Sequence, residues 1–131
     1  IYGDKAHDRI ELLQEINCGE YEMKTHEELK GSGEYQRWRH DKSGLLMPPG
    51  GESLNMFSER ILKGYEELRS QHALKELSVS VVVCHGGSIS AILYHLFPKQ
   101  CQGNLYYWIP DPGHGYVLQL EDEAVTDLKK F

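Results

Sequence analysis

The sequence has few of the features that mark membrane, nucleic-acid-binding or disulfide-stabilised proteins. Its longest apolar run, around residues 79–84, is too short to span a bilayer. It has three cysteines, without metal-ligand spacing, which argues against a disulfide framework and against a metal site. Its 14 basic residues are outnumbered by 20 acidic ones, and the net charge of −6 gives no general attraction for nucleic acid or anionic lipid. We therefore expect a cytoplasmic protein that binds neither nucleic acid nor membrane.

The chain has the length of one domain. Its 131 residues, of which 40% are hydrophobic and 26% charged, can form one core beneath an ordinary polar surface. Residues 1–131 are therefore predicted to form a single domain. Because the chain starts without methionine and in the middle of a pattern, we expect it to be a piece of a longer protein.

Local signals predict several helices. Thr25 and Glu28 match a capping box, so a short helix should follow and end near residues 31–33, before a second one over 35–40. Residues 46–51 are a loop by composition.

A long helix is predicted to begin near Ser53 and to end near residue 71. Apolar residues recur there at helical spacing, which predicts one buried stripe: Leu54, Phe57, Ile61, Tyr65 and Leu68. A later helix is predicted over residues 88–97, where Pro98 ends it.

The strand signals predict an α/β fold. Residues 79–84 are rich in valine and nearly all apolar, which is typical of a strand covered on both faces in a parallel sheet. Residues 115–121 alternate, and a turn at 122–123 should lead into a return strand over 124–128. Residues 10–16 are predicted to be a short strand or a loop packed on the core.

A histidine and two glycines follow the valine run and indicate an oxyanion site. Gly86 and Gly87 let a ligand approach the backbone closely, and a helix that begins there presents free N–H groups at its positive end. A protonated His85 could donate to a phosphoryl oxygen, with help from the backbone of Gly86, Gly87 and Ser88. The alternative is a strand-end histidine that hydrogen-bonds a carbonyl group.

Two acidic residues are further candidates. Glu15 is a carboxyl group in an apolar context before a glycine turn, which suits a donor of a proton to a leaving oxygen, although spacing alone favours an ordinary surface glutamate. Glu52 and Ser53 follow the loop and could lie on the rim of a site. In the alternative, Ser53 caps the long helix, Glu52 interacts favourably with the helix dipole, and Arg60 pairs with Glu52.

Four segments, in this order, resemble motifs of the histidine phosphatase superfamily, also called the phosphoglycerate mutase-like family. They are residues 13–22, residues 25–29, residues 49–54 with Arg60, and residues 83–89. The resemblance covers nearly the whole chain. It implies a three-layer αβα fold of the phosphoglycerate mutase type, with a mostly parallel sheet flanked by helices.

The resemblance also implies roles for single residues. His85 would be the second active-site histidine, which contacts the phosphoryl group, and Glu15 would be the proton donor. Glu22, Glu52 and Ser53 would lie on the substrate rim.

One motif of the family is absent from the sequence. The family's nucleophile is a histidine in an Arg-His-Gly segment on the first strand, and these three residues do not occur in succession here. We expect the chain to begin after that segment, so that its fold is incomplete at the N-terminus and the chain alone is inactive. The missing strand would leave an open apolar edge at residues 79–84, through which copies of the chain would form a homo-oligomer.

The leading functional hypothesis is a phosphomonoester hydrolase that acts on a small phosphorylated substrate through a phosphohistidine intermediate. The form of residues 19–22 resembles the phosphatase branch of the family more than the mutases. This mechanism requires neither a metal nor an organic cofactor. Two alternatives remain: a phosphoglycerate mutase, and a non-catalytic relative that binds phosphate or a protein.

Overall fold

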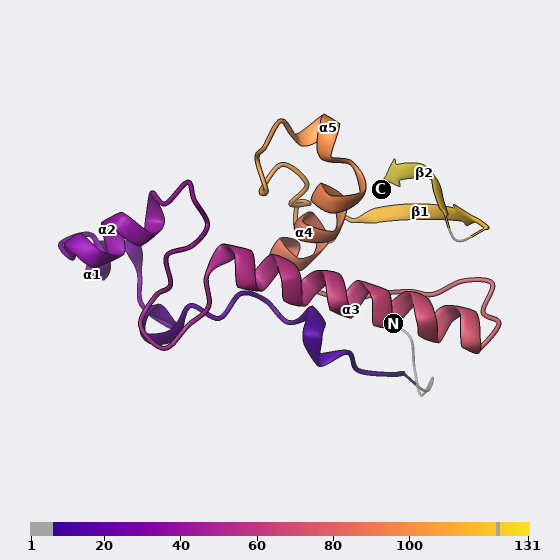
Figure 1. The fold of residues 1–131 in the computed structure, drawn as a ribbon, viewed down its shortest axis with the longest axis horizontal. Helices are drawn as coiled ribbons and strands as arrows, with labels where there is room; N and C mark the ends of the chain where they lie inside the picture. Colours follow the sequence, from indigo (N-terminus) through magenta and orange to yellow (C-terminus); the bar gives the residue numbers. More distant parts are fainter. Residues whose placement is uncertain (1–6, 123) are drawn as a thin grey trace.

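The structure is a computed structural model that describes residues 7–122 and 124–131 (Figure 1). Two 3-10 turns, five helices and a two-stranded sheet are seen in this part of the chain. In chain order they are η1 (Glu11–Leu13), η2 (Gly19–Tyr21), α1 (His26–Leu29), α2 (Gly33–Arg39), α3 (Leu54–Leu74), α4 (Gly86–Leu96), α5 (Pro98–Cys101), β1 (Tyr116–Glu121) and β2 (Ala124–Lys130).

The long helix α3 organises the molecule. The side chain of Ser53 accepts a hydrogen bond from the N–H of Met56 and caps α3 where the sequence predicted its start. The helix packs against α4 and η1. Its predicted stripe supplies much of the main core, which consists of Leu13, Phe57, Ile61, Tyr65, Ala91 and Ile92. Residues 10–16 therefore form a loop with one 3-10 turn on this core, which was the second of the two predicted alternatives.

The helices α1 and α2 lie apart from α4, α5 and the sheet, as Figure 1 shows. The predicted capping box of α1 is confirmed, because Thr25 and Glu28 exchange hydrogen bonds between side chain and backbone. Three aromatic rings, those of Tyr21, Tyr35 and Trp38, pack against one another beside these helices with centroids 5.3–5.9 Å apart. This part of the chain thus has its own small cluster.

The predicted buried strand over residues 79–84 is not seen in the described part of the chain. No residue of this run pairs in a sheet with another part of residues 7–122 or 124–131. Val79, Val81 and Val83 are 73%, 65% and 83% exposed. A strand requires a neighbouring backbone for its N–H and C=O groups, and none is beside this run in the described chain.

The sheet that is described is an antiparallel hairpin. The strands β1 and β2 pair with Leu118 opposite Leu128, and the register shifts between Gln119 and Leu120. Both predicted strands are confirmed, whereas residue 123 of the predicted turn lies outside the described residues. Leu118 and Leu128 pack against a second core cluster, formed by Leu93, Cys101 and Trp108. The three-layer parallel sheet is not seen in the described part of the chain, and none of the helices described there has the length and apolar character needed to cross a membrane.

Candidate functional site

The structure brings Glu15 to the beginning of α4, where His85 is the N-cap residue. The N–H of Gly87 donates to Oε2 of Glu15 at 3.2 Å. The first N–H groups of a helix have no partner within the helix, so this carboxylate satisfies one of them. A Cβ atom at Gly87 would lie 2.3 Å from Oε1 of Glu15, so the contact depends on a glycine. Gly87, which the sequence predicted to allow close approach of a ligand, thus allows the close approach of Glu15, the predicted acid.

His85 is exposed at this site. Its carbonyl oxygen accepts the N–H of Ile89 at 3.0 Å, which closes the first turn of α4. Its imidazole makes no cap hydrogen bond to the helix. The ring is therefore not held by a backbone carbonyl of the described chain, as the alternative interpretation required, and it is accessible to a ligand.

The neighbouring residues of the glycine turn have different environments. A Cβ atom at Gly86 would lie 3.1 Å from the side chain of Ile109. The hydroxyl of Ser88 is fully buried and donates to the carbonyls of Leu13 at 3.0 Å and Gln14 at 3.3 Å. The side chain of Ser88 is therefore unavailable to a phosphate, and its predicted role rests on its backbone N–H alone.

Two of the sequence motifs dock against each other next to Glu15. The N–H of Glu52 donates to the carbonyl of Asn17, and the N–H of Asn17 donates to the Glu52 carboxylate, both at 2.9 Å. The N–H of Glu20 donates to the carbonyl of Pro49 at 2.8 Å. Gly19 has a φ of +53°, and a Cβ there would lie 2.1 Å from the Pro49 oxygen, so only glycine permits this approach.

The three residues predicted for a substrate rim have structural contacts. Ser53 is buried and its hydroxyl caps α3, so the hydroxyl is occupied by the helix and its place on a substrate rim stays a prediction. Glu52 is occupied by Arg60 and by the N–H of Asn17. Glu22 is exposed, and its carboxylate accepts the N–H of Cys18 at 2.7 Å.

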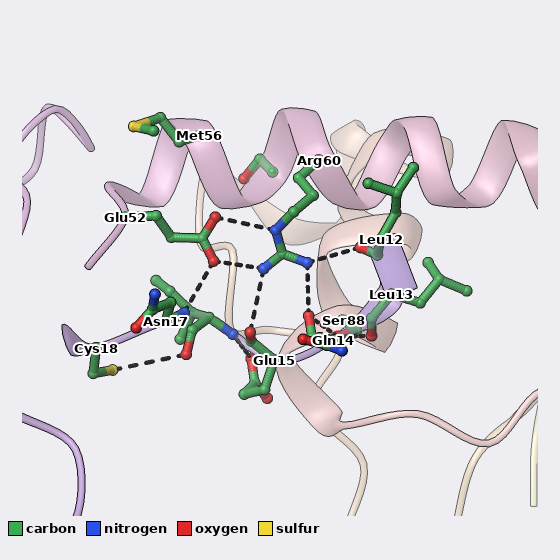
Figure 2. Close-up of polar contacts among 12 residues, drawn as sticks. Leu12, Leu13, Gln14, Glu15, Asn17, Cys18, Glu52, Met56, Arg60 and Ser88 are labelled. Atoms are coloured by element: carbon green, nitrogen blue, oxygen red, sulfur yellow. Dashed lines mark hydrogen bonds and ion pairs between the residues drawn. The ribbon is translucent and has the colours of Figure 1, made fainter. Parts of the chain in front are cut away.

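Arg60 has more contacts than the sequence indicated (Figure 2). The predicted pair with Glu52 is confirmed, with Nε of Arg60 at 3.1 Å from Oε2 of Glu52. The guanidinium also donates to three backbone carbonyls of the segment that carries the acid: Leu12 at 2.8 Å, Gln14 at 3.0 Å and Glu15 at 3.2 Å. Nothing in the sequence spacing pairs Arg60 with this segment.

The ion pair determines the charge state of Glu52. Burial acts to raise the pKa of Glu52, but the hydrogen bonds from Arg60 and Asn17 and the charge of Arg60 together lower that pKa below its ordinary value. The side chains of Arg60 and Glu52 are 23% and 13% exposed, so water screens the pair only in part. Glu52 therefore remains ionised and keeps its hydrogen bonds at neutral pH.

Cys84 and Tyr106 lie within electrostatic reach of Glu15. Burial, with a further contribution from the charge of Glu15, raises the pKa of Cys84 to about 11, so the thiol is protonated at neutral pH and is not a nucleophile there. Tyr106 is exposed, whereas its neighbour Trp108 is buried. The phenol of Tyr106 is nevertheless partly removed from water, which raises its pKa, and electrostatic interactions with Cys18 and Glu15 raise the pKa further.

Two hollows adjoin these segments. One of about 220 Å³ is lined by Glu11, Gln14, Glu15, Asn17, Gly51, Glu52 and Arg60. One of about 550 Å³ lies between α2 and the proline–glycine loop and is lined by Tyr21, Glu34, Arg37, Trp38, Leu46, Met47, Pro48, Pro49, Gly50 and Gly51. No group of His, Cys, Asp and Glu side chains suited to a metal ion occurs in residues 7–122 and 124–131.

A family model described as the histidine phosphatase superfamily (branch 1) matches residues 4–129. The chain belongs to the histidine phosphatase superfamily. It is 33% identical over 89 residues to a 2,3-bisphosphoglycerate-dependent phosphoglycerate mutase of Cytophaga hutchinsonii. That similarity covers 66% of this chain and 40% of the mutase, so the chain matches less than half the length of this relative. No solved structure matches the chain. Members of the superfamily have an α/β, phosphoglycerate mutase-like fold, and the superfamily includes both phosphatases and mutases.

Proposed function

We propose that this chain is part of a cytoplasmic phosphomonoester hydrolase of the histidine phosphatase type, acting on a small phosphorylated substrate. One observation carries the proposal: the Glu15 carboxylate lies on the N–H of Gly87, in the helix turn that begins at the exposed His85. A proton donor and an imidazole therefore flank a positive helix end, which suits the charge distribution of phosphoryl transfer.

The proposed reaction has two steps. A histidine nitrogen forms a bond to phosphorus while the bond to the leaving oxygen breaks, and Glu15 gives that oxygen its proton. His85 and the N–H groups of Gly86, Gly87 and Ser88 stabilise the charge on the transferring group. Water then attacks phosphorus while the bond from phosphorus to the histidine nitrogen breaks, the Glu15 carboxylate takes the proton from the water, and inorganic phosphate is released. The attacking histidine is not assigned to a residue of this chain, because the sequence has no Arg-His-Gly segment. No metal or organic cofactor takes part.

The complete fold is part of the proposal. Residues 1–131 would form part of one three-layer αβα domain, in which residues 79–84 become a strand once a neighbouring strand pairs with them. The valine content of the run supports this, as does its position directly before His85 and α4. Ligands bind beyond the carboxyl ends of strands in such sheets, which is where His85 would then lie.

His85→Ala is expected to lower the turnover of p-nitrophenyl phosphate by about 100-fold, because a donor to the phosphoryl oxygens is lost. Turnover is measured in a form of the protein that contains these 131 residues together with an Arg-His-Gly segment. His95→Ala, on the exposed side of the same helix, is the matched control and should leave turnover unchanged. Equal turnover by wild type and His85→Ala would contradict the role of His85. The 131-residue chain alone is expected to show no turnover.

A phosphoglycerate mutase is the second candidate, and the relative from Cytophaga hutchinsonii favours it. A mutase would depend on a bisphosphorylated primer and would move phosphate between two hydroxyls of one substrate. Release of free phosphate from many substrates, without such a transfer, would exclude it. A non-catalytic relative would bind inorganic phosphate, which a titration followed by the NMR signals of the His85 ring would detect. Neither the 131-residue chain nor a longer form of the protein would then turn over a phosphate ester.

We also propose that the 131-residue chain associates with itself through the exposed run at residues 79–84. An exposed apolar run with unpaired backbone groups is a template for pairing with another chain. Val81→Lys is expected to raise the dissociation constant of the dimer at least about tenfold, measured by sedimentation. Leu74→Lys, at an exposed apolar position on α3, is the control. A chain that stays monomeric at all concentrations, or one that Val81→Lys does not affect, would contradict this assembly.

A further inference from the structure

We propose that Arg60 and Ser88 are positioning residues that together hold Glu15 in place for proton transfer. The inference rests on the proposed function of Glu15 and goes beyond it, because neither residue touches the substrate in that mechanism. It explains why an arginine from α3 and a buried hydroxyl from α4 converge on one short segment of irregular backbone (Figure 2).

Four consecutive carbonyl oxygens, those of residues 12–15, accept hydrogen bonds from these two side chains. Arg60 supplies three of the bonds, to Leu12 (2.8 Å), Gln14 (3.0 Å) and Glu15 (3.2 Å). Ser88 supplies the bond to Leu13 (3.0 Å) and a longer one to Gln14 (3.3 Å). The backbone that carries the carboxylate is thus fixed at each residue up to Glu15 itself.

Each of the two donors is itself held rigidly. The hydroxyl of Ser88 lies in the first turn of α4 and is fully buried, so water does not compete for its hydrogen bonds. The guanidinium of Arg60 is oriented by Glu52, whose carboxylate also accepts the N–H of Asn17. A planar guanidinium can donate in several directions at once, whereas a lysine ammonium is a single point charge and cannot reproduce this pattern.

The geometry connects the packing of two helices to the position of one proton donor. Since α3 and α4 pack against each other, the two side chains locate Glu15 relative to the N–H of Gly87 at the start of α4. A displacement of about 1 Å in a catalytic group can cost up to about 100-fold in rate. Loss of either donor should therefore weaken the proton transfer without removing the acid.

The kinetic test uses the dependence on the leaving group. An alkyl phosphate needs a proton on its leaving oxygen, whereas 2,4-dinitrophenyl phosphate releases a stable anion and does not. Arg60→Lys is expected to lower kcat for the alkyl ester by about 10- to 100-fold and for the dinitrophenyl ester by less than about threefold. Arg69→Lys, the same replacement further along α3, is the matched control. Equal losses for both esters would overturn the proposal, since a general structural defect affects both reactions.

The double variant separates this inference from the proposed function. Glu15→Gln alone should lower kcat for the alkyl ester and not for the dinitrophenyl ester. Absence of that pattern would refute the proposed role of Glu15 as the acid. If Arg60 acts through Glu15, adding Arg60→Lys to Glu15→Gln should cause no further loss on the alkyl ester. A further loss of tenfold or more would overturn the inference while leaving the proposed function intact.

A second variant, Ser88→Ala, does not depend on how well Arg60→Lys folds. A second measurement, hydrogen exchange at Gly87, does not depend on turnover. Ser88→Ala removes only a hydroxyl, and Ser70→Ala is its control, because the Ser70 hydroxyl also donates to a backbone carbonyl, that of Glu66. The N–H of Gly87 has Glu15 as its acceptor, so its hydrogen exchange in the 131-residue chain reports the position of that carboxylate. Exchange should become about tenfold faster in Ser88→Ala and remain constant at Leu93, a buried residue of α4. Unchanged exchange at Gly87 would overturn the proposal.

Discussion

Arg60→Met is expected to lower the free energy of unfolding by about 3 kcal/mol at pH 7. The substitution leaves the Glu52 carboxylate, whose side chain is 13% exposed, without its cation. It also leaves the carbonyls of Leu12, Gln14 and Glu15 without these donors. Removal of one partner of a mostly buried pair costs more than the pair contributes, because the remaining charge is neither hydrated nor compensated.

This cost is expected to depend on pH because Glu52 titrates differently in the two proteins. In the wild type, where the bonds and charge of Arg60 outweigh burial, the pKa of Glu52 is lowered. Such a group contributes stability above its unfolded pKa of about 4.3, and this contribution is lost as the pH falls through the folded pKa. In Arg60→Met the cation no longer opposes burial, so we expect the pKa of Glu52 to be higher than in the wild type and protonation of Glu52 to relieve the unpaired charge. The difference in stability between the two proteins should therefore shrink between pH 7 and pH 4.

Urea unfolding at these two pH values measures the effect. Lys63→Met, at an exposed position of the same helix, is the control and should cost less than about 1 kcal/mol at both pH values. Adding Glu52→Gln to Arg60→Met removes the unpaired charge and should restore part of the loss at pH 7. If Arg60→Met lowers the free energy of unfolding equally at pH 7 and pH 4, or by less than about 1 kcal/mol at pH 7, the ion pair of Arg60 and Glu52 is screened by water.

Gly87→Ala is expected to lower the turnover of an alkyl phosphate by about 100-fold or more while barely changing stability. The added Cβ would lie 2.3 Å from Oε1 and 2.8 Å from Oε2 of Glu15, so the carboxylate must move. The end of a flexible side chain moves at little cost in stability, and alanine is a better helix residue than glycine. The proposed acid, however, loses its position relative to the first turn of α4.

Steady-state kinetics and a melting curve separate the two effects of Gly87→Ala. Gly31→Ala is the matched control, because a Cβ atom at Gly31 meets nothing within 4 Å. Turnover of the alkyl ester that is equal in Gly87→Ala and in wild type would mean that Glu15 is not the acid in this position. A large drop in melting temperature would instead show that α4 cannot accommodate the methyl group.

Elements specified by nearby residues could be predicted from the sequence. The capping box of α1 and the Ser53 cap of α3 involve residues within three positions of one another, so their chemistry is visible in a short window. The apolar spacing of α3 likewise predicted the face that packs on the core, where Phe57, Ile61 and Tyr65 are buried and Leu54 and Leu68 are partly buried. The hairpin strands β1 and β2 followed from alternation and an intervening turn signal.

Features that depend on distant partners could not be predicted in the same way. The valine run has the composition of a buried strand, but a strand forms only with a neighbour, and none pairs with it in the described residues. Arg60 lies 45–48 positions from the carbonyls it binds, and no periodicity relates them. Spacing alone favoured an ordinary surface role for Glu15, and its apolar context together with the family resemblance made it a candidate acid. Its contact with Gly87 spans 72 positions and is a result of packing.

The docking of residues 17–20 on residues 49–52 has a consequence for how such proteins diversify. The hydrogen bonds between these segments close the intervening stretch, which contains α1 and α2, into a loop with both ends anchored beside Glu15. A loop with anchored ends can be lengthened, shortened or replaced at a modest cost in entropy, because its ends stay in place. The hollow lined by Tyr21 and Trp38 is formed by this loop and its anchored ends, so changes in the loop would alter the shape of the hollow while Glu15, the proposed proton donor, keeps its place.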